Sequence, residues 1–167
     1  NDGLRQLDVR ALGDWVLDTL AAAPDKAGIR HLVPVAHGAA MVMLDAAGQI
    51  VAALDYEDSV FEQTETAYRA VRDDFALTFS PLLPLGLNLG RQIHYLQQRR
   101  DDVFSRCAHI LLYPQYWAWL LSGVAASEVT SLGCHSDLWQ PAAGTFSPLA
   151  VKSGWAALMP RSSNVST

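Results

Sequence analysis

RHLVPVAHGAAMVMLDAAGQIVAALDYED, residues 30–58, is the part of the chain from which the rest of the fold can be predicted. Two short apolar runs lie on either side of a polar break at His37-Gly38, and a third run, residues 49–54, follows a turn at residues 46–48. Short runs rich in Val, Ile and Leu favour buried strands over helices. We therefore expect three strands in the middle of a sheet. His37 and residues 55–58 would lie at strand ends, where layered α/β proteins commonly bind ligands.

Composition and charge limit the classes of protein to consider. The chain has 167 residues, half of them hydrophobic and 17% charged, which suits one globular domain with a core. The formal net charge is -5, and two aspartates follow the basic pair Arg99-Arg100, so we expect neither a nucleic-acid nor a membrane partner. The two cysteines, Cys107 and Cys134, make no disulfide framework. A reduced, cytoplasmic location is the simpler interpretation.

Helical patterns surround the apolar stretch. Asp8 suits an N-cap, apolar residues recur on one face from Val9 to Ala23, and Pro24 ends the predicted helix. Further along, the pattern predicts a partly exposed helix over residues 59–74, an ordered loop over 80–86, a helix over 87–99, a fourth strand over 108–113, a helix from Pro114 to Gly123, and a helix from Ser147-Pro148 through Leu158.

Common catalytic and metal-binding motifs are not found in the sequence. It contains neither a GxGxxG nor a GxxxxGK[ST] phosphate loop, and no GxSxG elbow. Cys107, His109, Cys134 and His135 do not have the usual spacing of metal ligands, so we predict no metal site and interpret them as structural residues. The neighbours His135-Ser136-Asp137 resemble a catalytic triad in name only, because triad members meet in space.

The polar strand ends are the candidate binding site. Glycine beside His37 allows a small molecule to approach the backbone closely, although a histidine bonded within a turn is an equal alternative. Asp55-Tyr56-Glu57 joins carboxylates to an aromatic ring, which is suitable for the hydroxyls and the C–H face of a sugar. A solvated acidic loop is the alternative for Glu57 and Asp58.

Five stretches then follow one another in a characteristic order: residues 7–20 with their tryptophan, the His-Gly hairpin of residues 37–57, LNLGRQIHYLQQ at 87–98, residues 113–139, and FSPLAVKSGW at 146–155. In this order they resemble the N-terminal domain of the FGGY carbohydrate kinases, which include xylulokinase and glycerol kinase. The chain departs from the family pattern at Gln92 in place of a lysine, Tyr95 in place of a tryptophan, Gln115 in place of an aspartate and Ser122 in place of a threonine. We interpret these changes as marks of a divergent subfamily.

The resemblance implies an α/β fold, namely a ribonuclease H-like (actin-like ATPase) lobe with a mixed sheet flanked by helices, incomplete in this chain. Residues 1–160 would be part of the sugar-binding lobe, and residues 161–167 a tail or linker. The family's Asp-x-Gly-Thr phosphate loop is not matched here, and its catalytic aspartate, in a Gly-Asp motif, lies well downstream of the stretch that corresponds to residues 146–155, past residue 167. We therefore expect a piece of a longer kinase that is inactive alone and has no catalytic residue of its own.

The implied activity of the full-length enzyme is transfer of the ATP γ-phosphate to a hydroxyl of a sugar or polyol, with ATP and Mg²⁺ as cofactors. This piece would supply the substrate contacts, for which the candidates are His37, Gly38, Asp55, Tyr56 and Glu57. A homodimer is left open. So are two other classes of protein: an actin-like or ribonuclease H-like binding domain without phosphoryl transfer, and an unrelated α/β enzyme such as a hydrolase.

Overall fold

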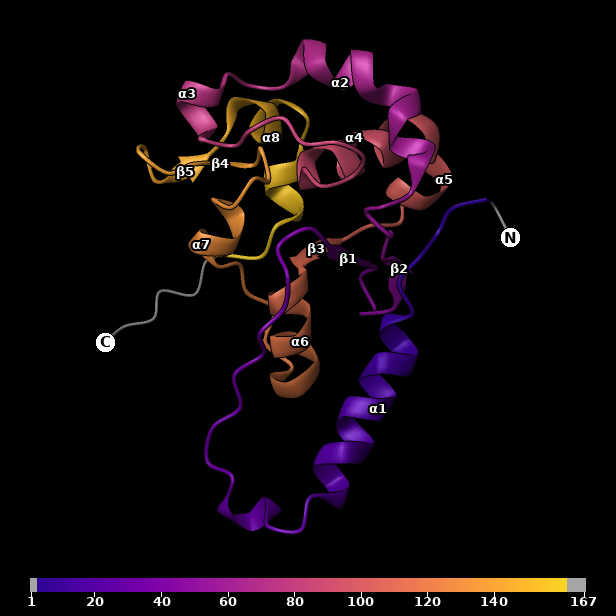
Figure 1. Ribbon diagram of the computed structural model, residues 1–167, viewed down its shortest axis with the longest axis vertical. Helices are drawn as coiled ribbons and strands as arrows, with labels where there is room; N and C mark the ends of the chain where they lie inside the picture. Colours follow the sequence, from indigo (N-terminus) through magenta and orange to yellow (C-terminus); the bar gives the residue numbers. More distant parts are fainter. Residues whose placement is uncertain (1–2, 162–167) are drawn as a thin grey trace.

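The centre of the molecule is a three-stranded antiparallel sheet in the order β2-β1-β3 (Figure 1). The computed structural model describes residues 3–161. Strand β1 (Met41–Leu44) pairs with β2 (Ile50–Ala52) on one side and β3 (His109–Leu112) on the other. The Asp45 carboxylate accepts hydrogen bonds from the backbone N–H groups of Ala47 and Gln49, at 2.9 and 2.8 Å, and so closes the turn between β1 and β2.

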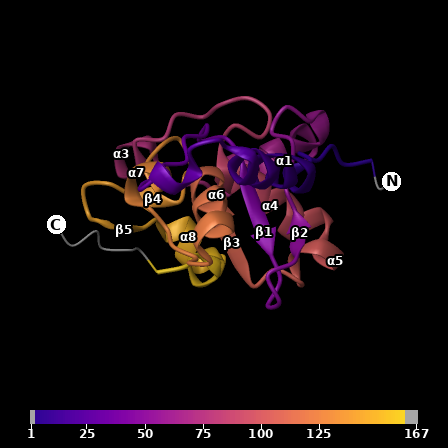
Figure 2. The ribbon, with the colours of Figure 1, turned by 90° about the horizontal axis from the view of Figure 1, so that it is seen from below.

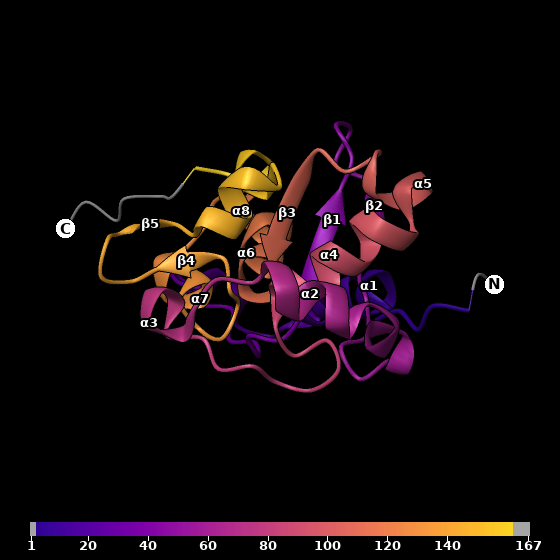
Figure 3. The ribbon, with the colours of Figure 1, turned by 90° about the horizontal axis from the view of Figure 1, so that it is seen from above.

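Helices cover both faces of this sheet. Figure 2 shows α1 (Val9–Ala22) and α6 (Tyr113–Ser122) on one side of the strands, and Figure 3 shows α4 (Leu89–Arg99) on the opposite side. Side chains of β1 alternate between the faces, as strand geometry requires. Met41 and Met43 pack in a cluster with residues of α4, and Val42 and Leu44 pack in a second cluster with residues of α1 and α6. Burial on both faces explains why this part of the sequence is continuously apolar.

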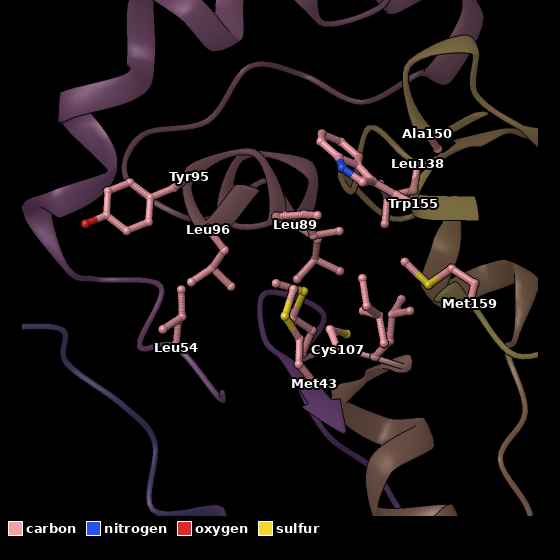
Figure 4. Close-up of a cluster of buried hydrophobic side chains, with 14 of the residues drawn as sticks. Met43, Leu54, Leu89, Tyr95, Leu96, Cys107, Leu138, Ala150, Trp155 and Met159 are labelled. Carbon is pink, nitrogen blue, oxygen red and sulfur yellow. The ribbon is translucent and has the colours of Figure 1, made fainter. Parts of the chain in front are cut away.

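The larger cluster extends beyond the sheet to the C-terminal part of the chain. Figure 4 shows Trp155 and Met159 on the same side as Leu89, with Met43 below them. The remaining elements form the outer part of the molecule: η1 (Lys26–Gly28), η2 (Ser59–Thr64), α2 (Glu65–Val71), α3 (Phe75–Thr78), α5 (Asp101–Phe104), α7 (Val129–Leu132), β4 (Trp139–Gln140), β5 (Thr145–Phe146), α8 (Pro148–Lys152) and η3 (Trp155–Leu158).

Several helix ends lie where local chemistry predicts them. The Asp8 side chain caps α1 by accepting from the backbone N–H of Ala11 at 2.9 Å. Helix α6 carries proline in its first turn, and Gly123 ends it with φ of 75°. The predicted last helix is shorter than expected, because α8 stops at Lys152 and the left-handed Gly154 turns the chain into η3. The tail predicted after residue 161 lies outside the described residues.

The strand predicted over residues 30–36 is wrong for this chain. These residues form no strand, and the side chains of Val33 and Val35 are 80% and 92% exposed. The sheet has the order β2-β1-β3, and this segment pairs with none of its strands in the described part of the chain. The α/β class is confirmed, but all strand pairs within residues 3–161 are antiparallel rather than mixed. In the same range, no helix combines the length and apolar character needed to cross a membrane.

Candidate functional site

The predicted residues His37 and Tyr56 lie side by side. Their ring centroids are 5.3 Å apart with an edge-on geometry, and the centroid of the Tyr113 ring lies 4.9 Å from that of His37. The backbone N–H of Tyr113 donates to the carbonyl of Ala40 at 3.0 Å, which anchors the start of α6 beside the start of β1. The hairpin and α6 therefore bring together three rings from separate parts of the sequence.

Gly38 lies close to a second loop. A Cβ added at this position would be 3.7 Å from both the Sγ of Cys134 and the Nε2 of His135, which is ordinary van der Waals contact. The Nδ1 of His135 lies 3.0 Å from the carbonyl oxygen of Leu87. Because a carbonyl can only accept, Nδ1 carries the proton in this arrangement, and in the neutral ring Nε2 is left as an acceptor near Gly38.

Two of the acidic residues after β2 contact the N-terminal segment. The Asp55 carboxylate forms an ion pair with Arg5 at 2.6 Å and accepts from the backbone N–H of Glu57 at 2.9 Å. The Asp58 carboxylate is buried, accepts from the backbone N–H of Arg5 at 2.7 Å, and caps η2 through the backbone N–H of Val60. These two carboxylates hold the N-terminal segment against the end of β2, while Glu57 is exposed.

Gln92 links helix α4 by hydrogen bonds to the residue that follows the turn at His37-Gly38. Its side chain is fully buried in α4, and its Nε2 donates to the carbonyl of Ala39 at 2.7 Å and to that of Gly86 at 2.6 Å. Its Oε1 has no hydrogen-bond partner among the described residues. Loss of either donated bond would leave a second buried polar atom of Gln92 without a partner, which would cost free energy. The two bonds therefore fix the position of the loop before β1 with respect to α4.

The residues His135-Ser136-Asp137 do not act together. His135 faces Gly38, Ser136 donates to the carbonyl of Leu132, and the Asp137 carboxylate accepts from the hydroxyl of Tyr68 at 2.5 Å and pairs with Arg72 at 2.7 Å. Burial, followed by the adjacent Asp137 carboxylate, raises the pKa of Tyr68 well above its ordinary value. This cluster therefore has the character of a buried structural network.

Two residues of the site were not predicted as binding residues from the sequence. Tyr113 has the pattern of a residue that begins a helix, and His135 lies in a small polar stretch without a motif. Both reach the site through long-range packing, and no local signal distinguishes them. Burial raises the pKa of Tyr113 from its ordinary value, which keeps its hydroxyl protonated near neutral pH. Between residues 3 and 161, no three His, Cys, Asp or Glu side chains are grouped so that they could hold a metal ion.

Comparison with known proteins places this geometry in context. Neither a protein-family model nor a curated protein matches the chain. Among solved structures, a carbohydrate kinase from Novosphingobium aromaticivorans is 48% identical with a TM-score of 0.88, over 96% of this chain and 34% of that one. A xylulose kinase from Rhodospirillum rubrum is 17% identical with a TM-score of 0.69, over 96% and 35% of the two chains. A gluconate kinase from Lactobacillus acidophilus is 12% identical with a TM-score of 0.69, over 97% and 34%.

The last two similarities show the fold alone, whereas the first also extends to the sequence. The chain spans about a third of the length of the solved kinases that it matches. The resemblance that the order of sequence features indicates is therefore confirmed: over almost its whole length, this chain is similar to about one third of a carbohydrate kinase.

Proposed function

We propose that this chain is the sugar-binding part of a longer ATP-dependent carbohydrate kinase of the FGGY type, with a ribonuclease H-like lobe. The contact between the rings of His37 and Tyr56, with Gly38 and His135 next to them, is the observation that supports this most directly. The 48% identity to a carbohydrate kinase gives independent support. Because the chain spans only a third of that protein, the activity proposed is that of the longer polypeptide.

The residues near His37 have the chemistry that a sugar or polyol needs. Aromatic rings such as those of Tyr56 and Tyr113 can pack against C–H groups, and imidazole nitrogens and a phenol can exchange hydrogen bonds with hydroxyls. Of the residues predicted at the start, we propose His37, Gly38 and Tyr56 as direct contacts and keep Asp55 and Glu57 as candidates. His135 joins them because its Nε2 faces Gly38.

In this proposal the phosphate-binding loop and the catalytic base belong to segments outside this chain. Mg-ATP, when bound, supplies the phosphoryl group and neutralises charge. The residues described here orient the hydroxyl that receives it and shield it from water. No catalytic residue is proposed among residues 3–161.

The first test is sugar-dependent ATP turnover by the full-length protein. ADP release should rise when one member of a panel of sugars, polyols and sugar acids is added, and the product should carry a phosphate ester in its mass spectrum. A full-length protein that binds a small molecule but never transfers phosphate would contradict the kinase proposal. It would favour an actin-like or ribonuclease H-like binding domain instead.

The second test separates the two roles of Asp55. If its carboxylate contacts the sugar, Asp55→Ala should weaken sugar binding about tenfold, the cost of one lost hydrogen bond of a charged group, and leave ATP binding unchanged. Arg5→Ala is the matched control, because it breaks the same ion pair and keeps the carboxylate. Calorimetric titration of both variants measures this directly. Equal losses in the two variants would show that Asp55 acts only through the N-terminal segment.

A further inference from the structure

His135 is held in a backbone conformation that few residues other than glycine adopt. Its φ is 37°, and that of Asp137 is 64°. Such strain persists only where neighbouring groups fix it, and it is concentrated at functional sites. The amide of Asn88, which is fully buried, donates to the His135 carbonyl at 2.9 Å. The backbone N–H of Gly90 donates to the next carbonyl, that of Ser136, at 2.8 Å. Helix α4 and the residue before it therefore fix the main chain that carries the His135 ring.

The imidazole of His135 presents a hydrogen-bond acceptor to the candidate site. Its Nδ1 lies 3.0 Å from the Leu87 carbonyl oxygen, so the neutral ring carries its proton on Nδ1 and its free lone pair on Nε2. Nε2 lies 3.7 Å from the position that a Cβ at Gly38 would occupy. No group among residues 3–161 donates a hydrogen bond to Nε2. The atom that faces Gly38 therefore needs a donor that the described residues do not supply.

The side chains of residues 3–161 that lie against His37 and Gly38 share one property, which is the lack of a cationic group. They are Tyr56, Tyr113, Cys134 and His135. A carboxylate accepts hydrogen bonds and cannot donate them, so it binds best to cations or to several N–H groups. A sugar hydroxyl both donates and accepts. At this position a hydroxyl would satisfy Nε2, whereas a carboxylate would place a second acceptor against it.

We propose that His135 is a specificity-determining residue of the sugar site. Its Nε2 accepts a hydrogen bond from a substrate hydroxyl and disfavours a carboxylate at the same position. The substrate is then an uncharged sugar or polyol rather than a sugar acid. This inference deepens the proposed function and rests on it, because it assumes that the substrate lies beside Gly38.

Matched ligands test this in the full-length protein. Calorimetric titration compares pentoses, hexoses, their ketoses and their polyols with the corresponding aldonic acids. In the pairs xylitol with xylonate and glucitol with gluconate, only a terminal hydroxymethyl group is replaced by a carboxylate. The uncharged member of a pair should bind about tenfold more tightly, which is the effect of one hydrogen bond. Equal or tighter binding of the acids would overturn the proposal, and so would the absence of binding by every compound in the series.

Two variants separate selection by His135 from a role in folding. In His135→Asn, the side-chain amide tolerates positive φ and can still donate to the Leu87 carbonyl, but it has no atom at the position of Nε2. In His135→Gln, the amide oxygen can reach that position as an acceptor. His135→Asn should therefore reduce the preference for the uncharged ligand about tenfold, and His135→Gln should restore most of it. An unchanged preference in His135→Asn would show that the ring has only a structural role.

The Cys134 thiol shows whether the ligand lies beside Gly38. Its Sγ lies 3.7 Å from the same Cβ position and the residue is exposed, whereas Cys107 is buried and serves as the internal control. An uncharged ligand at ten times its Kd should slow alkylation of Cys134 by iodoacetamide about tenfold, because the ligand-free fraction falls by that factor. Unchanged alkylation would place the ligand elsewhere and overturn the proposal.

Sugar-dependent ATP turnover by the same protein distinguishes this proposal from the proposed function. Preferred binding of an uncharged ligand, with protection of Cys134 and without turnover, would contradict the kinase function alone. Turnover with a preference for the acids would contradict the role of His135 alone.

Discussion

At the residue scale, Asp137 is a buried carboxylate that depends on its neighbours to replace the water it loses on folding. Its side chain is fully buried, with a backbone φ of 64°, and its carboxylate is paired with Arg72 and bonded to the hydroxyl of Tyr68. Arg72 also donates to the carbonyl of Ser80 at 2.8 Å. A buried carboxylate is tolerated only when its partners compensate for lost hydration. The network therefore joins α2, the loop after α3 and the segment before β4.

Removal of one partner from this network should be costly. Arg72→Met should lower the free energy of unfolding by about 3 kcal/mol, because it leaves the Asp137 charge buried and under-compensated. Arg69→Met is the control on the same helix: Arg69 pairs with Glu65 at 2.6 Å on the exposed surface, so its loss should cost less than about 1 kcal/mol. Urea unfolding at neutral pH compares the two variants. Equal losses of unfolding free energy in the two variants would mean that the hydrogen bond from Tyr68 is enough to stabilise the buried Asp137 carboxylate without Arg72.

At the scale of elements, glycine allows α4 to approach its neighbours closely. A Cβ at Gly90 would lie 2.7 Å from the hydroxyl of Tyr68 and 3.1 Å from the backbone oxygen of Ser136. The backbone N–H of Gly90 donates to that same oxygen at 2.8 Å. Helix α4 therefore begins in direct contact with the segment that carries His135, and this contact sets the position of one side of the candidate site.

An alanine at this contact should separate the elements. Gly90→Ala should destabilise the fold by about 2 kcal/mol, because part of the clash is with backbone. Gly13→Ala in α1 is the matched control, since its Cβ would meet the flexible end of Leu120 at 3.1 Å, and the higher helix propensity of alanine offsets the crowding. Thermal unfolding of both variants measures the difference. Two equal shifts would contradict the close approach of α4 to residues 135–137.

At the scale of the whole molecule, the sheet separates two apolar clusters, and the larger one contains a titratable thiol. Cys107 is buried with residues of α4 and η3, and burial raises the pKa of its thiol from 9.0 to about 11. The unfolded chain therefore loses this proton at a lower pH than the folded protein does. Stability from this group is complete below about pH 9 and declines as the pH rises toward 11.

The free energy of unfolding should consequently fall by up to about 2 kcal/mol between pH 8 and pH 11 through Cys107 alone. Cys107→Ala should remove that part of the slope, whereas Cys134→Ala, which alters an exposed thiol, should keep it. Urea titrations at a series of pH values under reducing conditions provide the measurement. A slope that is the same in all three proteins would show that the buried thiol does not contribute.

Local chemistry was enough to predict many of the elements. The cap at Asp8, the proline that begins α6, the glycine that ends it and the turn that closes β1 onto β2 all depend on a few neighbouring residues. The family resemblance was also accessible from the sequence, because it lies in the order of such features. The length of the last helix was less accessible, since one glycine turned the chain out of the helix after Lys152.

The sequence by itself determined that residues 41–44 and 50–54 are apolar enough to be buried, where α1 begins, where α6 begins and ends, and that His37 and Tyr56 lie at the ends of apolar runs. Only the tertiary structure decided which of these groups meet. It placed Tyr113 and His135 beside the turn at Gly38, and it paired Asp55 with Arg5. It also gave residues 30–36 no strand partner among residues 3–161. The physical reason is that a strand needs a partner for its backbone and an apolar side chain needs a surface to cover, and both come from residues distant in sequence.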